Sequence, residues 1–341
     1  MFQFLHSLFG THPPPSGAAT ADSIRAAVER VVDGVDPRLR AVPHYQRTLW
    51  QPVQRAVTYL AESVKGLPPA IPFDRRRSQV DPRLRALFLD PDHVLETLSS
   101  SPDVRGFVAQ SAGPMPPELF VALRVERTER TILGMSLIHD RLMRDVPQTT
   151  VSFHNHRVAF PAANESETRR QVQARAFDYL IEVTRHRLTA KRARRMQLEQ
   201  QLHQGHAKAA AAARLGWGDR EAAAPALANP TDGQRMREME GELGQLRADT
   251  ATFSEQLALV ADMVGEPGRH LRLDRVSMTL DNLNVKVPTN ARKAADTLTF
   301  NEMQIGADRR ITLEMIRFPS DQLLEQPDFL TGYQRASHQP G

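Results

Sequence analysis

Apolar residues recur at helical spacing between residue 18 and about residue 113. One stripe within residues 44–66 consists of Tyr45, Leu49, Val53, Ala56, Leu60 and Val64. Pro52 is expected to kink this helix or to mark its true start, because proline lacks the N–H that an interior helix position donates. Three shorter segments begin with a proline that follows an aspartate or a serine, which is typical of a helix start: DPRLRALFL, DPDHVLETL and SPDVRGFV. We therefore predict a helical domain over 18–113, preceded by a flexible segment over 1–17.

The apolar period changes to two at Pro116, as in β-strands. Apolar residues alternate in LFVALRV, the charged stretch ERTER at 126–130 predicts a turn, and QTTVSFHNHRVAF adds a strand rich in β-branched and aromatic residues. An amphipathic helix over 119–144 is the alternative interpretation. Strand patterns return near residue 268 as HLRLDRVSMTL, NLNVKV, TLTFNEMQI and RITLEMIRF, with a GADR turn between the last two. We predict one antiparallel sheet formed by 114–163 together with 268–320, followed by a tail over 321–341.

The segment between these half-sheets, 164–267, carries heptad repeats on two stretches. The stronger seam consists of Met236, Met239, Leu243, Leu246, Thr250, Phe253, Leu257, Val260 and Val264. An insertion must leave and re-enter the sheet at neighbouring points, which an antiparallel pair of helices achieves. The predicted fold class is α+β: a helical N-terminal region and a small antiparallel β-sheet, split in sequence by a long antiparallel coiled-coil hairpin with a tip loop at 203–231.

The most basic run of the chain, RHRLTAKRARR at 185–195, lies on the outgoing helix of this hairpin. Its candidate nucleic-acid contacts are Arg187, Lys191, Arg192, Arg194 and Arg195. Folding the hairpin at its tip places this run beside Glu238, Glu240 and Glu242 of the return helix. Because matched charges release few counterions, we expect the run to stabilise the hairpin rather than to bind nucleic acid.

The tip loop contains one tryptophan, Trp217, between two glycines and close to Arg214 and Leu215. A flexible loop is the simplest interpretation. A partner-binding site at Trp217, Leu215 and Arg214 is the sharper hypothesis, because an exposed tryptophan is a common anchor in protein interfaces.

The best chemical candidate is FHNH at 153–156. On a regular strand, His154 and His156 would project from the same face, as two imidazole ligands of one divalent metal ion would. His139 and Asp140 could complete such a site if the strands bring them close. A pair of half-exposed strand histidines is the alternative, since no longer metal-binding pattern is present.

The heptapeptide VDPRLRA occurs at 35–41 and again at 80–86. The residues that follow the two copies do not repeat, so a helical repeat protein is not indicated. Aspartate before a proline is a favourable helix start, and we interpret both copies as local helix-opening segments.

The composition of the chain excludes several classes of chemistry. The chain has no cysteine, which excludes disulfides, thiolate metal sites and cysteine nucleophiles, and its net charge is only +4. The opening segment MFQFLHSLFG lacks the basic residues of a secretory signal and is too short to cross a bilayer. We expect a cytoplasmic protein–protein interaction or scaffold protein that is not an enzyme, has no integral membrane association or required cofactor, and could form a homodimer. A metal-dependent enzyme and a nucleic-acid-binding protein are the alternatives.

Overall fold

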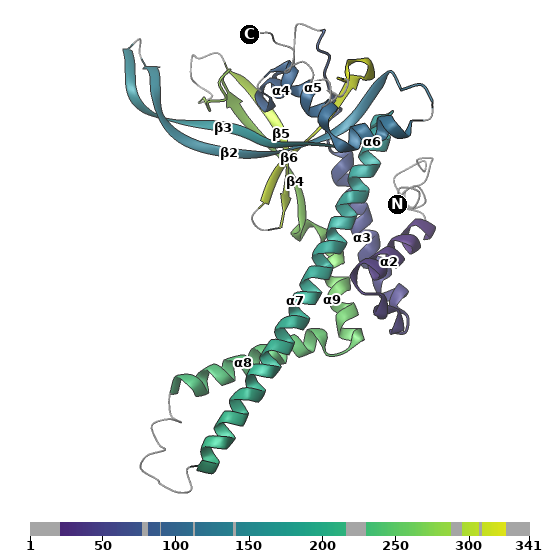
Figure 1. Cartoon of the computed structure of the whole chain (residues 1–341), viewed down its shortest axis with the longest axis vertical. Helices are drawn as coiled ribbons and strands as arrows, with labels where there is room; N and C mark the ends of the chain where they lie inside the picture. Colours follow the sequence, from purple (N-terminus) through teal and green to yellow (C-terminus); the bar gives the residue numbers. More distant parts are fainter. Residues whose placement is uncertain are drawn as a thin grey trace, which may run out of the picture. The chain divides into compact units, whose positions relative to one another are not determined.

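The computed structural model describes residues 21–76, 81–88, 90–111, 113–138, 141–215, 230–287, 295–306 and 309–324. The fold class is α+β, as predicted, with helices and a largely antiparallel sheet (Figure 1). The chain divides into two compact units, Met1–Leu60 with Ala176–Gly268 and Ala61–Arg175 with Arg269–Gly341. The helices after residue 80 pack on the sheet of the second unit.

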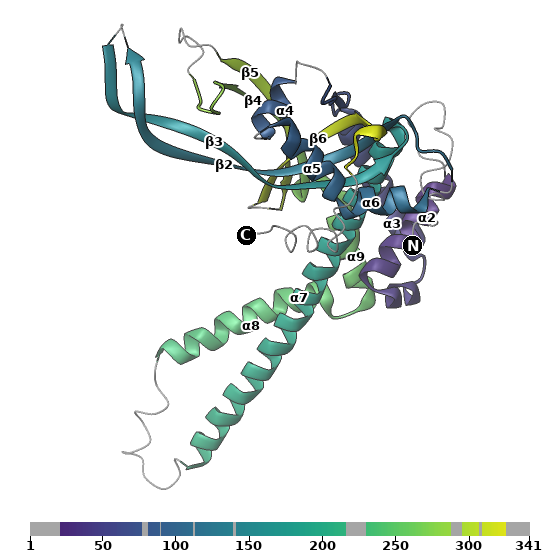
Figure 2. The ribbon, with the colours of Figure 1, turned by 45° about the horizontal axis from the view of Figure 1, so that its top comes forward.

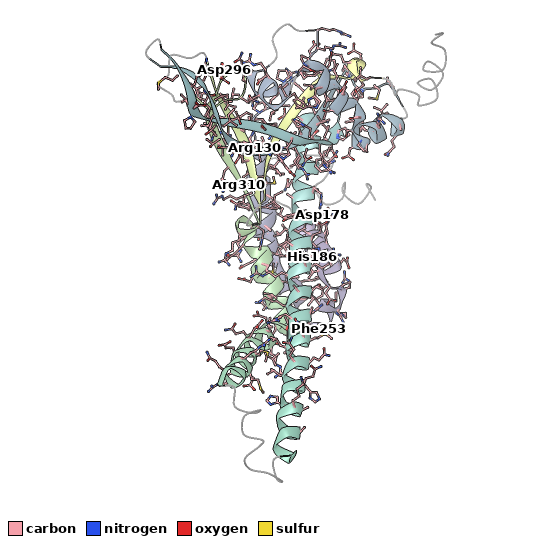
Figure 3. The ribbon with its side chains drawn as sticks, turned by 60° about the vertical axis from the view of Figure 1, so that its left-hand side comes forward. Arg130, Asp178, His186, Phe253, Asp296 and Arg310 are labelled. Carbon is pink, nitrogen blue, oxygen red and sulfur yellow. The ribbon has the colours of Figure 1, made fainter. Side chains whose placement is uncertain are left out.

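The first unit is helical in its described part. It contains α2 (Ala21–Val35), η1 (Pro37–Ala41), α8 (Pro230–Thr250), α9 (Phe253–Gly265) and parts of α3 (Tyr45–Lys65), α7 (Glu165–Leu215) and η2 (Pro267–Arg269). Helix α2 lies close against α7: a side chain at Gly34 would collide with Ile181. Nearby, Nε of Arg30 donates a hydrogen bond of 2.7 Å to Asp178, which Figure 3 labels on α7. Apolar packing and an ion pair therefore hold α7 against α2.

Two expectations about these helices are changed. Pro52 lies inside one continuous helix α3 and does not mark its start. The return helix, expected to run without interruption, is broken at 251–252, and Figure 1 shows α8 and α9 meeting at an angle. The reason is a new helix start: Thr252 and Glu255 form a reciprocal capping box that begins α9.

Helices α7 and α8 pack through a small apolar seam. Leu198, Leu202 and Leu243 are buried together, with Met236, Met239 and Leu246 packed against them. Met236, Met239, Leu243 and Leu246 occupy the heptad positions expected from the sequence. Because the return helix is in two pieces, α7 and its described partner helices do not form one continuous two-helix coiled coil.

The second unit is built on a sheet in which six strands are described. The strands are β1 (Ile71–Pro72), β2 (Glu118–Ile138), β3 (Arg141–Ala162), β4 (Leu271–Leu280), β5 (Asp296–Ile305) and β6 (Arg309–Pro319). The order is β3-β2-β6-β5-β4, with β1 pairing parallel to β6. Since β2 and β6 pair antiparallel from Glu118↔Pro319 to Val125↔Thr312, the two half-sheets form one sheet, as predicted.

Each face of the sheet is covered. One face carries β2 residues Leu119, Val121, Leu123 and Val125, which pack with apolar residues of α4 (Pro82–Leu87), α5 (Pro91–Ser100) and α6 (Pro102–Gln110). The opposite face carries Ala122, Leu313 and Met315, which pack with residues at the end of α3 and the start of α7. We call these the α4 face and the α7 face.

Strands β2 and β3 are longer than expected. The ERTER stretch at 126–130 does not turn but continues β2 as far as Ile138, because Arg127 to Arg130 pair with residues 150–153 of β3. Figures 1 and 2 show β2 and β3 running together past the ends of the other strands of the sheet. We call this two-stranded part, 126–138 with 141–154, the ribbon.

The stretch NLNVKV does not form a full strand. Val285 and Lys286 instead make single bridges, to Thr150 of β3 and Leu280 of β4. The segment thereby links the two strands at the ends of the sheet order.

Both copies of VDPRLRA begin a helix, as interpreted from the sequence. Asp36 caps η1 and Asp81 caps α4, each with proline in the first turn. Each aspartate also accepts side-chain hydrogen bonds from the arginine two residues later, at 3.0 Å from Arg38 and 3.2 Å from Arg83. The repeated peptide is thus one local device, used once in each unit.

Candidate functional site

The two strand histidines lie on opposite faces of β3. Glu126 pairs with His154 and Arg124 pairs with Arg157, so β3 has one residue more than β2 between these pairs. The extra residue forms a β-bulge at Asn155, which has a φ of 55°. The bulge reverses the alternation, and the expectation that His154 and His156 share a face is wrong.

Each histidine has its own protein contacts. Nδ1 of His154 lies 3.1 Å from the hydroxyl of Thr128, on the exposed side of the ribbon. His156 turns to the α4 face, where its Nε2 lies 2.7 Å from the carbonyl oxygen of Leu87 and its ring packs on Phe88 and His93. Burial lowers the pKa of His156, which favours the neutral ring at this position.

The metal hypothesis gains no support from these positions. Among the residues that the structure describes, no group of three or more histidines and carboxylates is arranged to hold a metal ion. The other two proposed ligands, His139 and Asp140, lie outside the described residues.

Most of the basic run on α7 is engaged within the first unit. Lys191 pairs with Asp249, and Nε and Nη2 of Arg194 donate to Glu242 at 2.7 and 2.8 Å. Arg195 donates to the carbonyl oxygen of Thr250 at 2.7 Å. Of the three return-helix glutamates expected beside the run, Glu242 pairs with it, and Lys191 pairs with Asp249 instead. Arg187 is exposed.

Arg192 makes a different contact, which the sequence did not indicate. Its Nη2 donates to Asp36 at 2.6 Å and also to Gln256, so α7, η1 and α9 meet at one buried carboxylate. Burial alone would raise the pKa of Asp36, but hydrogen bonds from Arg38 and Arg192 lower it to about 2. Beside it, Arg38 lies 5.7 Å from the centre of the Phe253 ring, which Figure 3 labels at the start of α9.

The partner-binding residues proposed for the tip fall at the limit of the described chain. Arg214 and Leu215 are the last residues of α7, and nothing is described of their side chains. Trp217 lies outside the described residues.

Glu314 on β6 is the most unusual ionisable group of the second unit. It belongs to the α4 face with Ile316 and Phe318, and its side chain is 1% exposed. The backbone N–H and the Nδ2 of Asn301 donate to its carboxylate at 3.0 to 3.1 Å, and Nη1 of Arg83 lies 3.8 Å away. Burial raises the pKa of Glu314 to about 7, even though Asn301 and Arg83 act in the opposite direction. The group can therefore exchange a proton near neutral pH.

A chain of ion pairs extends along the same face. Glu302, opposite Thr312 in the sheet, accepts a hydrogen bond from Arg127 of the ribbon. Arg127 also binds Glu129, whose other oxygen accepts from Lys286 at 2.6 Å. Burial and the charge of Arg127 lower the pKa of Lys286. The ion pairs connect β5, β2 and Lys286 at the base of the ribbon.

The ribbon exposes apolar side chains beyond this network. Leu133 is 68% and Met135 is 63% exposed, and Ile132 and Met143 are also exposed. Sequence reasoning missed both this surface and Glu314. The available signals were a run with apolar residues at both odd and even positions, TILGMSLI, and a glutamate at a core position of RITLEMIRF.

Comparison of the chain with protein-family models, with curated proteins and with solved structures found no match. Among the described helices, none combines the length and apolar character needed to cross a membrane.

Proposed function

We propose that the chain is a protein–protein interaction or scaffold protein, and that it presents the distal part of the α7–α8 arm to a protein partner. One observation carries this proposal. Helix α7 continues as one helix to Leu215, although the apolar seam that it buries with α8 is small. A long helix pair with so little buried surface serves better as a support for a binding surface than as the wall of an active site.

The contacts along α7 hold the arm rigid, as a support for a binding surface requires. At its base, α7 is held by Gly34 and Arg30 of α2 and by the Asp36–Arg192 pair, and further along by Arg194 with Glu242. Four cations of the basic run, Lys191, Arg192, Arg194 and Arg195, are occupied in contacts within the first unit, which favours a protein partner over nucleic acid. Met196, which directly follows Arg195 on α7, is 66% exposed and accessible on the surface of the arm.

The proposal is tested with the full chain as bait in native lysate. One variant replaces 203–231 by a short flexible linker, a second carries Trp217→Ala, and the control carries Val108→Ala, an exposed position on α6. We expect quantitative mass spectrometry to identify proteins that both the wild type and the control enrich. The recovery of these proteins should fall at least tenfold with both arm variants, which is about the effect of removing one hot-spot residue. Recovery of all of these proteins by both arm variants, with unchanged melting temperatures, would refute the proposal.

A further inference from the structure

Among the strands that the structure describes, none pairs with one edge of the ribbon. Strand β2 pairs with β6 only as far as Val125, whereas its pairing with β3 continues to Ile138. Between Glu126 and Ile138, no described strand pairs with the second edge of β2. An open edge presents unpaired backbone N–H and C=O groups, which readily accept another strand.

Apolar side chains flank this edge on both faces of the ribbon. Leu133 and Met135 belong to one face, and Ile132 belongs to the other, together with Met143 because Met143 pairs with Ser136. Their exposure follows from the missing neighbour, since a side chain on an edge strand is covered from one side only. A strand added beside β2 would cover apolar surface on both faces at once.

The outer edge of β3 differs, because it is protected against pairing. It contains Pro147, which has no N–H to donate, and bulges at Asp145 and Asn155, both with positive φ. Backbone groups of residues 149 and 151 are already bonded to Lys286 and Asn284. Proline and bulges are devices by which proteins block edge pairing, and β2 has neither between Glu126 and Ile138.

We propose that the free edge of β2 pairs antiparallel with the same edge of a second copy of this chain, about a twofold axis at Ile132. In this register Glu129 lies opposite Met135 and Arg130 lies opposite Gly134, so no charged residue between 129 and 135 faces another charge. Ile132 faces its own copy, and Thr131 faces Leu133. Identical edges related by a twofold axis make each contact away from the axis twice, and the pairing satisfies the edge-facing backbone groups of both copies.

A lipid surface fits this ribbon less well. Arg141 begins β3 opposite Ile138, beyond the exposed apolar residues, so a cation would enter the bilayer before them. The open backbone edge would also remain unpaired in hydrocarbon, which is costly.

The test uses the full chain, with Ile132→Lys and Ile132→Glu prepared separately. The wild type is expected to be a dimer by sedimentation velocity. In a dimer of either variant alone, two like charges face each other at the twofold axis. The dissociation constant of that dimer should therefore increase on the order of tenfold or more. A one-to-one mixture of the two should recover dimers, and native mass spectrometry should show them to contain one copy of each variant. Only a twofold contact at residue 132 predicts this recovery.

The control pair is Leu283→Lys and Leu283→Glu, because Leu283 is 76% exposed and lies outside the ribbon. Both control variants should remain dimers, and circular dichroism should confirm that all four variants fold. A second pair tests the register: Thr131→Lys and Leu133→Glu should each weaken the dimer, and the double variant should restore it.

Three results would overturn the proposal. If the wild type is monomeric at its highest soluble concentration, the edge of β2 does not pair with a second copy, and its partner is another protein. A monomer that co-sediments with phosphatidylcholine vesicles assigns the ribbon to a lipid surface. Dimers that persist in both Ile132 variants place the self-contact elsewhere, for example on the arm, and leave the proposed function intact.

Discussion

Glu314 is a buried acid whose protonation couples to the stability of the sheet. Its carboxylate is almost fully buried against Asn301, with Arg83 as the nearest cation, and its pKa is raised to about 7. A raised carboxyl pKa means that the folded state binds a proton that the unfolded state has released. The stabilisation is therefore complete below the ordinary value of 4.5 and is lost as the pH rises to about 7.

We predict that Glu314→Gln removes this dependence. Near pH 4.5 the amide resembles the protonated acid, and the two proteins should differ little in their free energies of unfolding. By pH 8 the wild type should have lost about 3 kcal/mol relative to the variant. Urea unfolding of both proteins across this range measures the difference, and subtracting the two curves removes contributions of opposite sign from groups such as His156. A constant difference at every pH would contradict the assignment.

At the scale of elements, strands were predicted well where the alternation of residues was regular and poorly where bulges interrupt it. The hairpin of β5 and β6 and the joining of the two half-sheets follow from period-two patterns. Bulges at Asp145, Asn155 and Phe160 are positions with positive φ that no local pattern marks, and the one at Asn155 separates His154 from His156. The T-x-x-E sequence at Thr252 begins α9, although the heptad spacing continues across it without a break.

The exposed side of α8 gives a prediction about the arm. A β-carbon added at Gly241 or Gly244 would meet no other atom within 4 Å, and both glycines are helical. Glycine costs roughly 0.5–1 kcal/mol relative to alanine inside a helix. We expect Gly241→Ala and Gly244→Ala each to slow hydrogen exchange of α8 amides by about threefold, without altering the rest of the chain. Gly34→Ala is the contrasting variant: it should destabilise the first unit, because its β-carbon would collide with Ile181. Faster exchange in α8 after either of the first two changes would show that the free arm is packed differently.

For the whole molecule, the two copies of VDPRLRA provide a matched pair of probes, because Asp36 lies in the first unit and Asp81 in the second. Both aspartates cap a helix and bind the arginine two residues later, but only Asp36 also binds Arg192 of α7.

The pKa of Asp36 is lowered to about 2, so the stabilisation that its carboxylate provides is present above pH 3.8 and is lost as the pH falls toward 2. At pH 7, Asp36→Asn should cost about 2.5 kcal/mol, and Asp81→Ala about 1 kcal/mol, the usual value of a cap. Hydrogen exchange with mass spectrometry should place the first loss in α2, α7 and α9 and the second in α4 and the neighbouring strands. If either variant accelerated exchange equally in both units, the units would unfold as one, and the Asp36–Arg192 contact would not be a local clamp of the arm.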